Sequence, residues 1–289
     1  MRRTKKLKEL LQAREILVAP GAYDVFSAKI IEKIGFQAVY MTGYGTSASV
    51  LGQPDVGLLS MTEMAKRAGD IAKAVNVPVI ADADTGYGNP LNVRRTVMEY
   101  ERAGIAAIQL EDQVFPKKCG HMLGRKIIPK EEMVQKIKAA CDVREDKDFI
   151  VIARTDARTN YGLEEAIERG KAYQEAGADL MFIESPENTE EMKLINSSFT
   201  DIPTLANMVE GGRSPILTVD ELEKLGFSIV IFSTGPLYSA AKGLKDYLTT
   251  LKTKKATSSR INDMISFVEF NELIGLQDYL DLEKKYQVK

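Results

Sequence analysis

The segment EDQVFPKKCGH, residues 111–121, places a thiol, two lysines and a histidine directly after a pair of acids. Cationic neighbours lower the pKa of a thiol, and this prepares the thiol for proton transfer. Cys119 is therefore a candidate catalytic acid, and Lys117 and His121 belong to the same candidate centre. An ordinary surface loop does not need this combination of residues.

Other chemistries fit the same residues poorly. His121 is the only histidine of the chain, which excludes a site built from several imidazoles. One histidine so close to one cysteine makes a poor tetrahedral zinc set, and no GxSxG turn supports Ser-His-Asp hydrolysis. The second cysteine, Cys141, lies in IKAACDV among apolar neighbours, so we expect it to serve in packing.

A second group of candidates consists of carboxylates in the stretch ADADTGYGNP, residues 81–90. Asp82 and Asp84 are two positions apart on an expected strand, so both should point to one face, and the following glycines let a ligand approach the backbone. Such a pair suits Mg²⁺, which takes a few carboxylates and keeps several waters. The alternative is a plain strand exit and turn, but Glu111 and Glu184 at other strand ends favour the metal site.

Strands must position these side chains, and eight short apolar runs of the sequence are expected to form the strands. The runs alternate with amphipathic stretches of helical period, which predicts βα units around a parallel sheet. They are EILVAP (15–20), AVYMTG (38–43), VPVIADAD (77–84), AAIQLED (106–112), FIVIARTD (149–156), DLMFIES (179–185), PTLANMV (203–209) and SIVIFS (228–233).

Four of the runs share an entry in which a helix end is followed by glycine: IEKIGF, YERAGI, YQEAGA and LEKLGF. Glycine accepts the left-handed conformation that stops a helix. Eight repeats of one supersecondary unit predict a (β/α)8 TIM-type barrel, with a doubly wound sheet as the alternative.

The barrel prediction places the active site at the C-terminal ends of the strands, and polar residues occur there in nearly every run. They are Thr42, Gly43, Asp82, Asp84, Glu111, Asp112, Arg154, Asp156, Glu184, Asn207, Glu210, Ser233 and Thr234. Converging acids repel one another unless a positive charge lies among them, and a divalent cation provides it.

Composition restricts the partners. With 289 residues and a net charge of −2, the chain has no charge excess that favours nucleic acid or a membrane. No apolar run approaches the roughly 18 residues of a membrane span, and the basic N-terminus lacks the apolar core of a secretion signal. We therefore expect a small-molecule partner and a cytoplasmic location.

Taken together, DADTGYGN, EDQ followed by KKCGH, and IARTDA resemble the phosphoenolpyruvate mutase and isocitrate lyase superfamily. The resemblance runs from about Gly21 to Gly243. It implies a (β/α)8 barrel, usually with the last helix exchanged between partner subunits, in homotetramers that are dimers of dimers. We expect the barrel in residues 1–257 and C-terminal helices in residues 258–289, either exchanged with a partner or forming an ordinary cap.

The resemblance also implies roles for the acids. Asp82 matches the residue that binds Mg²⁺ directly, with Mn²⁺ as an alternative metal. Asp84 and Glu111 match residues that hold the waters of the metal, and Asp55 in PDVG supports that shell.

For the substrate, the resemblance implies that Tyr40, Thr42, Gly43 and Tyr44 hold the carboxylate of a 2-oxo acid, partly through backbone amides. Arg154 matches the residue that binds the pyruvyl or oxalyl part. The rest of the substrate pocket is expected to be lined by Glu184, Asn207 and Ser233.

In the chemical step, Cys119 would protonate the departing carbanion, and Tyr40 or a metal-bound water would accept the proton of the substrate hydroxyl. The segment EDQVFPKKCGH would be a mobile gate that brings the acid in and excludes water. Mutases of the superfamily generally lack the cysteine, so its presence favours a lyase.

Within the superfamily, GYGTSASVLGQPDVGLLS and NMVEGG are similar to the branch of alkylmalate lyases and oxaloacetate hydrolases. The expected activity is cleavage of a 2-alkylmalate, such as 2,3-dimethylmalate, to pyruvate and a short carboxylate. The alternatives are 2-methylisocitrate lyase, oxaloacetate hydrolase and carboxyphosphonoenolpyruvate phosphonomutase. A barrel that binds a carboxylic acid without turnover, as a sensor or scaffold, is the non-enzymatic alternative.

Overall fold

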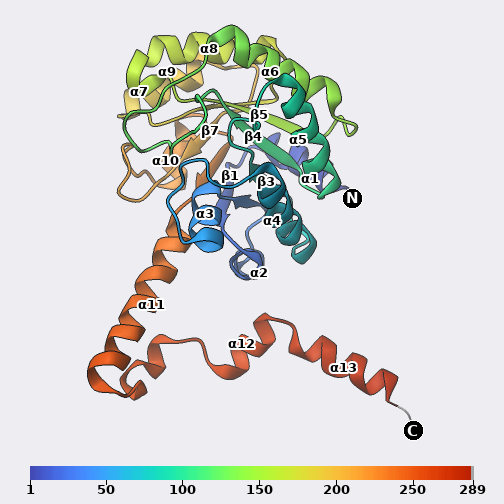
Figure 1. Ribbon diagram of the computed structural model, residues 1–289, viewed down its shortest axis with the longest axis vertical. Coiled ribbons are helices and arrows are strands. Elements are labelled where there is room, and N and C mark those ends of the chain that lie inside the picture. Colours follow the sequence, from blue (N-terminus) through green and yellow to red (C-terminus); the bar gives the residue numbers. More distant parts are fainter. Residues whose placement is uncertain (288–289) are drawn as a thin grey trace. The chain divides into compact units, whose positions relative to one another are not determined.

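The computed structural model describes residues 1–287, and its centre is an eight-stranded parallel sheet (Figure 1). The strands pair in the order β6-β5-β4-β3-β2-β1-β8-β7, and a parallel bridge between Met181 and Thr204 brings the two edges together. The strands are β1 (Leu17–Ala22), β2 (Val39–Met41), β3 (Val79–Asp82), β4 (Ala107–Glu111), β5 (Ile150–Thr155), β6 (Leu180–Ile183), β7 (Leu205–Asn207) and β8 (Ile229–Phe232). This nearly closed barrel confirms the predicted (β/α)8 fold, and the doubly wound alternative is wrong.

Helices follow the strands and cover the outside of the barrel (Figure 1). The four predicted helix-ending glycines, Gly35, Gly104, Gly177 and Gly226, have positive φ angles of 107°, 85°, 107° and 99°. The helices of this unit are α1 (Arg3–Leu11), α2 (Val25–Ile34), α3 (Gly43–Leu51), α4 (Met61–Ala74), α5 (Pro90–Arg102), α6 (Lys130–Val143), α7 (Arg158–Tyr161), α8 (Leu163–Glu175), α9 (Thr189–Ser198) and α10 (Val219–Lys224).

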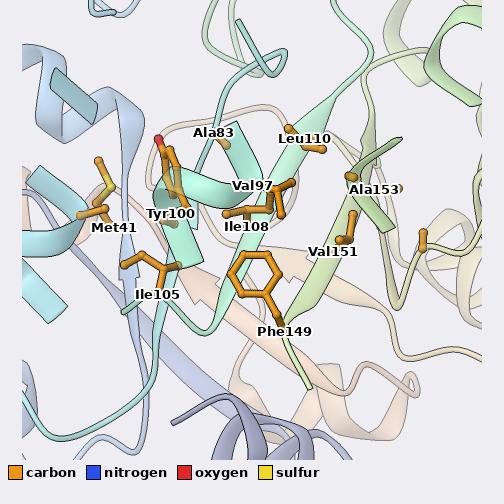
Figure 2. Close-up of a cluster of buried hydrophobic side chains, with 14 of the residues drawn as sticks. Met41, Ala83, Val97, Tyr100, Ile105, Ile108, Leu110, Phe149, Val151 and Ala153 are labelled. Carbon is orange, nitrogen blue, oxygen red and sulfur yellow. The ribbon is translucent and has the colours of Figure 1, made fainter. Parts of the chain in front are cut away.

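The alternation of side chains along each strand separates two layers of core. In β4, Ile108 and Leu110 face outward and pack against Val97 and Tyr100 of α5 (Figure 2). The intervening Ala107 belongs to the interior of the barrel. Because successive residues of a strand point to opposite faces, the strand has one face on the helices and one face in the barrel.

Helix α1 contributes to the interior rather than to the outer layer. Leu7 has no exposed surface and packs in one cluster with Leu17, Ile150 and Leu180, which lie at or next to the starts of their strands. The helix therefore fills the end of the barrel at which the strands begin. The opposite end, where the strands finish, is left for polar residues.

The chain consists of two compact units, Met1–Pro236 and Leu237–Lys289. The second unit contains most of α11 (Gly235–Lys254), followed by η1 (Ser258–Asp263), α12 (Phe267–Leu273) and α13 (Leu276–Tyr286). Within the described part of this unit no helix has a buried residue. The unit begins near the N-terminus of α11, whereas the sequence suggested a division after residue 257.

Over residues 1–287, none of the helices combines the length and the apolarity needed to cross a membrane.

Candidate active site

At the ends of most strands, the alternation that builds the interior core places a polar residue in an inward-facing position. These positions surround a cavity at the C-terminal ends of the strands, as the barrel prediction required. The predicted site residues that line it are Tyr40, Thr42, Tyr44, Asp55, Asp82, Glu111, Lys117, Cys119, His121, Arg154, Glu184, Asn207 and Ser233. The cavity also touches Thr234, one of the polar residues predicted at the strand ends, and Lys118, Gly120 and Val209, for which the sequence had predicted no role of their own.

Two predicted site residues, Gly43 and Asp84, lie just behind the cavity wall. A Cβ atom on Gly43 would come within 2.6 Å of Asp82 Oδ2, so glycine lets the first turn of α3 lie against this carboxylate. Asp84 has a positive φ of 48°, and its backbone N–H donates to Asp82 Oδ1 at 3.0 Å. Both residues therefore support Asp82 from behind.

Lys117 occupies the centre of the acidic cluster. Its Nζ atom lies 2.7 Å from Asp55 Oδ1 and 2.7 Å from Asp84 Oδ1, and all three side chains are buried. Burial alone would lower the pKa of Lys117, but Asp84 and Asp55 outweigh it and raise this pKa well above its usual value. Burial also raises the pKa of Asp84 to about 7, although Lys117 opposes that rise. Lys117 thus fixes the predicted loop onto the barrel.

The remaining acids fit a hard cation with few direct protein ligands. Glu111 is 1% exposed, and its Oε1 atom has no hydrogen-bond partner. Among residues 1–287, no three His, Cys, Asp or Glu side chains lie where they could hold a metal ion together. Mg²⁺ suits such a site because it binds through one or two carboxylates and keeps several waters. A structural zinc site, which needs four close ligands, does not fit.

The paired acids of the opening segment point in opposite directions. Glu111 faces the cavity, whereas Asp112 faces the outer layer and accepts hydrogen bonds from Thr155 Oγ1 at 2.7 Å and Tyr173 Oη at 2.8 Å. Asp112 also accepts from the backbone N–H of Asp156 at 2.9 Å. It therefore supports the end of β5 and has no contact with the cavity.

The segment from Gln113 to Ile127, called the gate loop below, is held at its base by an antiparallel bridge between these two residues. Its Cys119–Gly120–His121 tip covers the cavity. The cavity has a volume of about 30 Å³, which is room for little more than one water. The gate loop is therefore closed.

Two contacts hold the tip in place. Ser185 Oγ donates to the Gly120 carbonyl at 3.1 Å, and His121 Nε2 lies 3.3 Å from Glu184 Oε1. The backbone N–H of Arg213 donates to His121 Nδ1 at 2.9 Å, which places the imidazole proton on Nε2, toward Glu184. A Cβ atom on Gly120 would lie 2.2 Å from Arg154 Nη2, so only glycine allows this approach.

The expectation that cationic neighbours lower the pKa of Cys119 is wrong. Burial raises the pKa of this thiol to about 11, and the nearby carboxylates of Asp55 and Glu184 add to the rise. Lys117 stays charged, but its charge is balanced by the carboxylates of Asp55 and Asp84, so it does not stabilise a thiolate. Cys119 therefore remains a protonated thiol, which is the form that an acid requires.

Cys141 packs against the outer core, as predicted. Its Sγ atom donates to the Gly177 carbonyl at 3.1 Å, on the far side of the strands from the cavity. Burial raises the pKa of this thiol to about 11 as well. The two cysteines thus share a protonation state and differ only in where they lie.

Arg154 is held among three carboxylates. Its Nη2 atom lies 3.0 Å from Asp156 Oδ1 and 3.0 Å from Glu184 Oε2, and Nε lies 3.5 Å from Glu111 Oε2. Burial alone would raise the pKa of Glu184, but Arg154 and His121 outweigh it and lower this pKa. Burial alone would lower the pKa of Arg154, but Asp156 and Glu184 outweigh it and raise this pKa, so the arginine stays charged. Burial raises the pKa of Glu111 well above its usual value, although Arg154 opposes that rise.

Tyr40 does not fit the role of proton acceptor that the sequence left open for it. Burial and the charge of Asp82 raise its pKa well above the usual value, so the phenol stays neutral. Its Oη atom donates to Gln109 Oε1 at 3.1 Å. A neutral phenol in this position suits a hydrogen-bond donor.

Sequence reasoning missed several residues that shape the site. Gln109 was detectable, because it is a polar residue at an inward position between Ala107 and Glu111. Ser185 closes the predicted run DLMFIES directly after Glu184 but was not named as a site residue. Arg125 and Arg213 carry no signal of period or motif, since loops bring them to their positions. Only the folded structure reveals these contacts.

A family model described as phosphoenolpyruvate phosphomutase matches residues 7–252. The 2,3-dimethylmalate lyase of Eubacterium barkeri is 59% identical over 281 residues, which cover 97% of each chain.

Solved structures agree with the family match. An oxaloacetate acetylhydrolase in complex with 3,3-difluorooxalacetate has a TM-score of 0.94 and 39% identity, covering 100% of this chain and 98% of the other. A phosphonopyruvate hydrolase in complex with oxalate and Mg²⁺ has a TM-score of 0.90 and 32% identity, covering 99% of both chains. The chain belongs to the phosphoenolpyruvate mutase and isocitrate lyase superfamily.

Proposed function

We propose that the protein is a Mg²⁺-dependent carbon–carbon lyase that cleaves 2,3-dimethylmalate into pyruvate and propionate. The observation that carries this proposal is the buried, protonated thiol of Cys119 in a closed cavity that also contains Arg154 and three carboxylates from strand ends. The 59% identical relative named 2,3-dimethylmalate lyase supports the choice of substrate.

Two features of the cavity would bind the substrate: a positive charge and backbone N–H groups. Arg154 offers a guanidinium to a carboxylate of the substrate, and the first turn of α3 adds backbone N–H groups at its N-terminus, where anions are favoured. Thr42 caps this helix, since its side chain accepts from Gly45 N–H at 3.3 Å. Tyr44, Asn207 and Ser233 line other parts of the wall.

Cleavage needs a proton removed at one end of the breaking bond and a proton supplied at the other. The C2 hydroxyl would give its proton to a water held at the metal site by Asp84 and Glu111, since Tyr40 is a neutral donor. The C2–C3 bond breaks, and C2 becomes the carbonyl carbon of pyruvate. The bonding electrons stay on C3, and Cys119 Sγ–H gives C3 the proton that completes propionate. Closure of the gate loop keeps water away from the carbanion.

For the cation we propose Asp82 as direct ligand, with Asp84, Glu111 and Asp55 holding its waters. The unpartnered Glu111 Oε1 supports this assignment, as does Mg²⁺ in the related phosphonopyruvate hydrolase. When bound, Mg²⁺, or Mn²⁺ in its place, polarises the hydroxyl and carboxylate of the substrate. The ion pairs of Lys117 with Asp55 and Asp84 would keep these two carboxylates in place.

The test is pyruvate release from 2,3-dimethylmalate with Mg²⁺. Samples with 2-methylisocitrate, oxaloacetate and a carboxyphosphonate run in parallel. Rapid pyruvate release from dimethylmalate that stops in excess EDTA is expected, and activity that persists in EDTA would contradict the metal role. A phosphonomutase would survive Cys119→Ala, whereas the proposed lyase would not.

Oxaloacetate hydrolysis to oxalate and acetate is a second candidate, favoured by one observation. Ser233 lines the cavity and donates to Asn207 Oδ1 at 2.9 Å, so two polar groups face the substrate in place of an apolar wall. The related oxaloacetate acetylhydrolase structure supports the same alternative. Oxalate formation without pyruvate release from dimethylmalate would establish it.

We also propose that the protein assembles as a homotetramer, a dimer of dimers, through residues 258–289. Large apolar side chains in this segment are exposed, and exposed apolar patches mark sites of association. Among them are Phe267 (84%), Val268 (64%) and Ile261 (61%). A cytoplasmic location is proposed as well, supported by two cysteines that are both free.

A further inference from the structure

A second buried arginine, Arg125, connects the gate loop to the substrate-binding arginine. Arg125 is 3% exposed, and its Nη1 atom donates to Asp156 Oδ1. The same carboxylate accepts two hydrogen bonds from Arg154, from Nε to Oδ2 and from Nη2 to Oδ1, each at 3.0 Å. Asp156 is therefore shared between one arginine at the end of β5 and one arginine of the gate loop.

The position of Arg125 is fixed from several sides. Its Nη2 atom donates to Thr159 Oγ1 at the start of α7, and its carbonyl accepts from Asn160 Nδ2 at 2.6 Å. Asp156 is fixed too, because its backbone N–H donates to Asp112 Oδ1 at 2.9 Å. The ion pair between Arg125 and Asp156 thus holds the second half of the gate loop against the end of β5, which carries Arg154.

The charge balance around Arg154 explains why a second cation matters. Asp156 and Glu184 each lie 3.0 Å from the same guanidinium, so Arg154 alone leaves this group with an excess of negative charge. A carboxylate substrate would be repelled by that excess. Arg125 offsets the charge of Asp156, and its field also lowers the pKa of Glu184. Arg154 is then free to attract the substrate.

We propose that Arg125 is a positioning residue that couples closure of the gate loop to the binding of the substrate carboxylate by Arg154, acting through Asp156. The coupling arises because Arg125 belongs to the loop and brings its charge to Asp156 when the loop closes. This inference rests on the proposed function for its substrate, but it does not depend on which carboxylic acid is cleaved.

The test compares three variants of the full chain. Arg125→Met removes the charge and keeps the length, and Arg125→Lys keeps the charge. Arg144→Met is the matched control, because Arg144 is a half-buried arginine that pairs with Asp179 and donates from Nη1 to the Phe149 carbonyl at 2.7 Å, just before the start of β5 and away from the cavity. Circular dichroism and thermal melting identify conditions in which each variant is folded.

Three readouts separate coupling from simple structural support. Arg125→Met should raise KM by about tenfold or more and change kcat less, in the range of a coupling between two sites. It should weaken the binding of oxalate with Mg²⁺, measured by calorimetry, and speed tryptic cleavage after Lys117 or Lys118. Arg125→Lys should recover most of the affinity, and Arg144→Met should leave KM and cleavage near wild type.

The inference is overturned if folded Arg125→Met keeps the KM and the cleavage rate of the wild type, or if Arg144→Met changes them equally. It is also overturned if Arg125→Lys is as impaired as Arg125→Met, since shape rather than charge would then be responsible. If the wild type does not release pyruvate from 2,3-dimethylmalate, the proposed function fails. The cleavage comparison still decides the role of Arg125.

Discussion

At the scale of single residues, the site works through the protonation states that burial imposes. Cys119 is held as a thiol and Tyr40 as a phenol, while Lys117 and Arg154 keep their charges because carboxylates surround them. Proton donors and charged binding groups therefore coexist within one small cavity. A site with this division suits the cleavage of a hydroxy acid, in which a carbanion must be protonated quickly.

The role of Cys119 leads to a first prediction. Cys119→Ser should lower the turnover of 2,3-dimethylmalate by about 100-fold or more, the usual effect of losing a positioned acid. Pyruvate release measures it. Cys141→Ala, which changes the thiol on the opposite side of the strands, should stay near wild type. Near-normal turnover in Cys119→Ser would mean that another group supplies the proton.

A second prediction concerns pH. Because the pKa of Cys119 is raised to about 11, the acid form is fully present at neutral pH and is lost only as the pH rises through that value. The alkaline limb of kcat should therefore fall above about pH 10, well past the usual thiol range near pH 8.5. Alkylation by iodoacetamide at pH 8 should be slow. A limb centred near pH 8 would contradict the buried thiol.

At the scale of elements, the gate loop brings to the site residues that the strands do not carry, and its contacts hold it over the cavity. Lys117 attaches the loop to Asp55 and Asp84, and the Gly120 carbonyl attaches it to Ser185. Ser185 has a positive φ of 58°, which directs its hydroxyl to that carbonyl only at the cost of local strain. The loop is thus held by contacts to several different strand ends.

The close approach of Gly120 gives a third prediction. In Gly120→Ala the new methyl group would overlap Arg154 Nη2 and Glu184 Oε2, at 2.2 Å and 2.5 Å, so the loop could not close as it does now. We expect lower kcat/KM and faster tryptic cleavage after Lys117 or Lys118. Gly243→Ala is the control, because nothing lies within 4 Å of its Cβ position. Equal behaviour of the two variants would argue against a closed working state.

Helix α1 supports a fourth prediction. Leu7 has no exposed surface within the barrel interior, so Leu7→Ala should reduce the free energy of unfolding by about 2–5 kcal/mol. Urea unfolding followed by circular dichroism measures it. Activity per folded molecule should not change, because the helix lies at the end opposite the cavity. Leu194→Ala, at a position 49% exposed, should have little effect.

The sequence predicts the features that local patterns determine, and it does not predict those that arise only from tertiary contacts. Strands and helix ends follow from local patterns, and all eight runs and all four glycines occur where predicted. Site residues at strand ends follow from the same alternation. The pKa of Cys119 and the role of Arg125 were out of reach, because burial and pairing arise only when the loop folds over the barrel.

At the scale of the whole molecule, the two units differ in how they are built. The barrel has buried layers inside and outside its strands, whereas no helix in the described part of the second unit buries a residue. Helices that bury no residues gain little stability alone, since packing supplies most of it. The second unit therefore fits a role in association.

A fifth prediction follows for the assembly. The wild type should have the mass of four 32.0 kDa chains in size-exclusion chromatography with light scattering. The double substitution Phe267→Glu with Val268→Glu should reduce that mass, because both side chains are apolar and exposed. Leu91→Glu, which changes an exposed apolar residue of the barrel unit, is the control. A monomeric wild type would refute the proposal.

The closed cavity has a consequence for the kinetics of ligand capture. A cavity of about 30 Å³ is too small for a dicarboxylate, so the gate loop must open before a ligand can bind. The observed association rate should then level off as ligand concentration rises, at a ceiling equal to the opening rate. Stopped-flow mixing would measure this limiting rate directly. The opening rate of the gate loop is then an upper limit on the rate at which the enzyme can bind substrate.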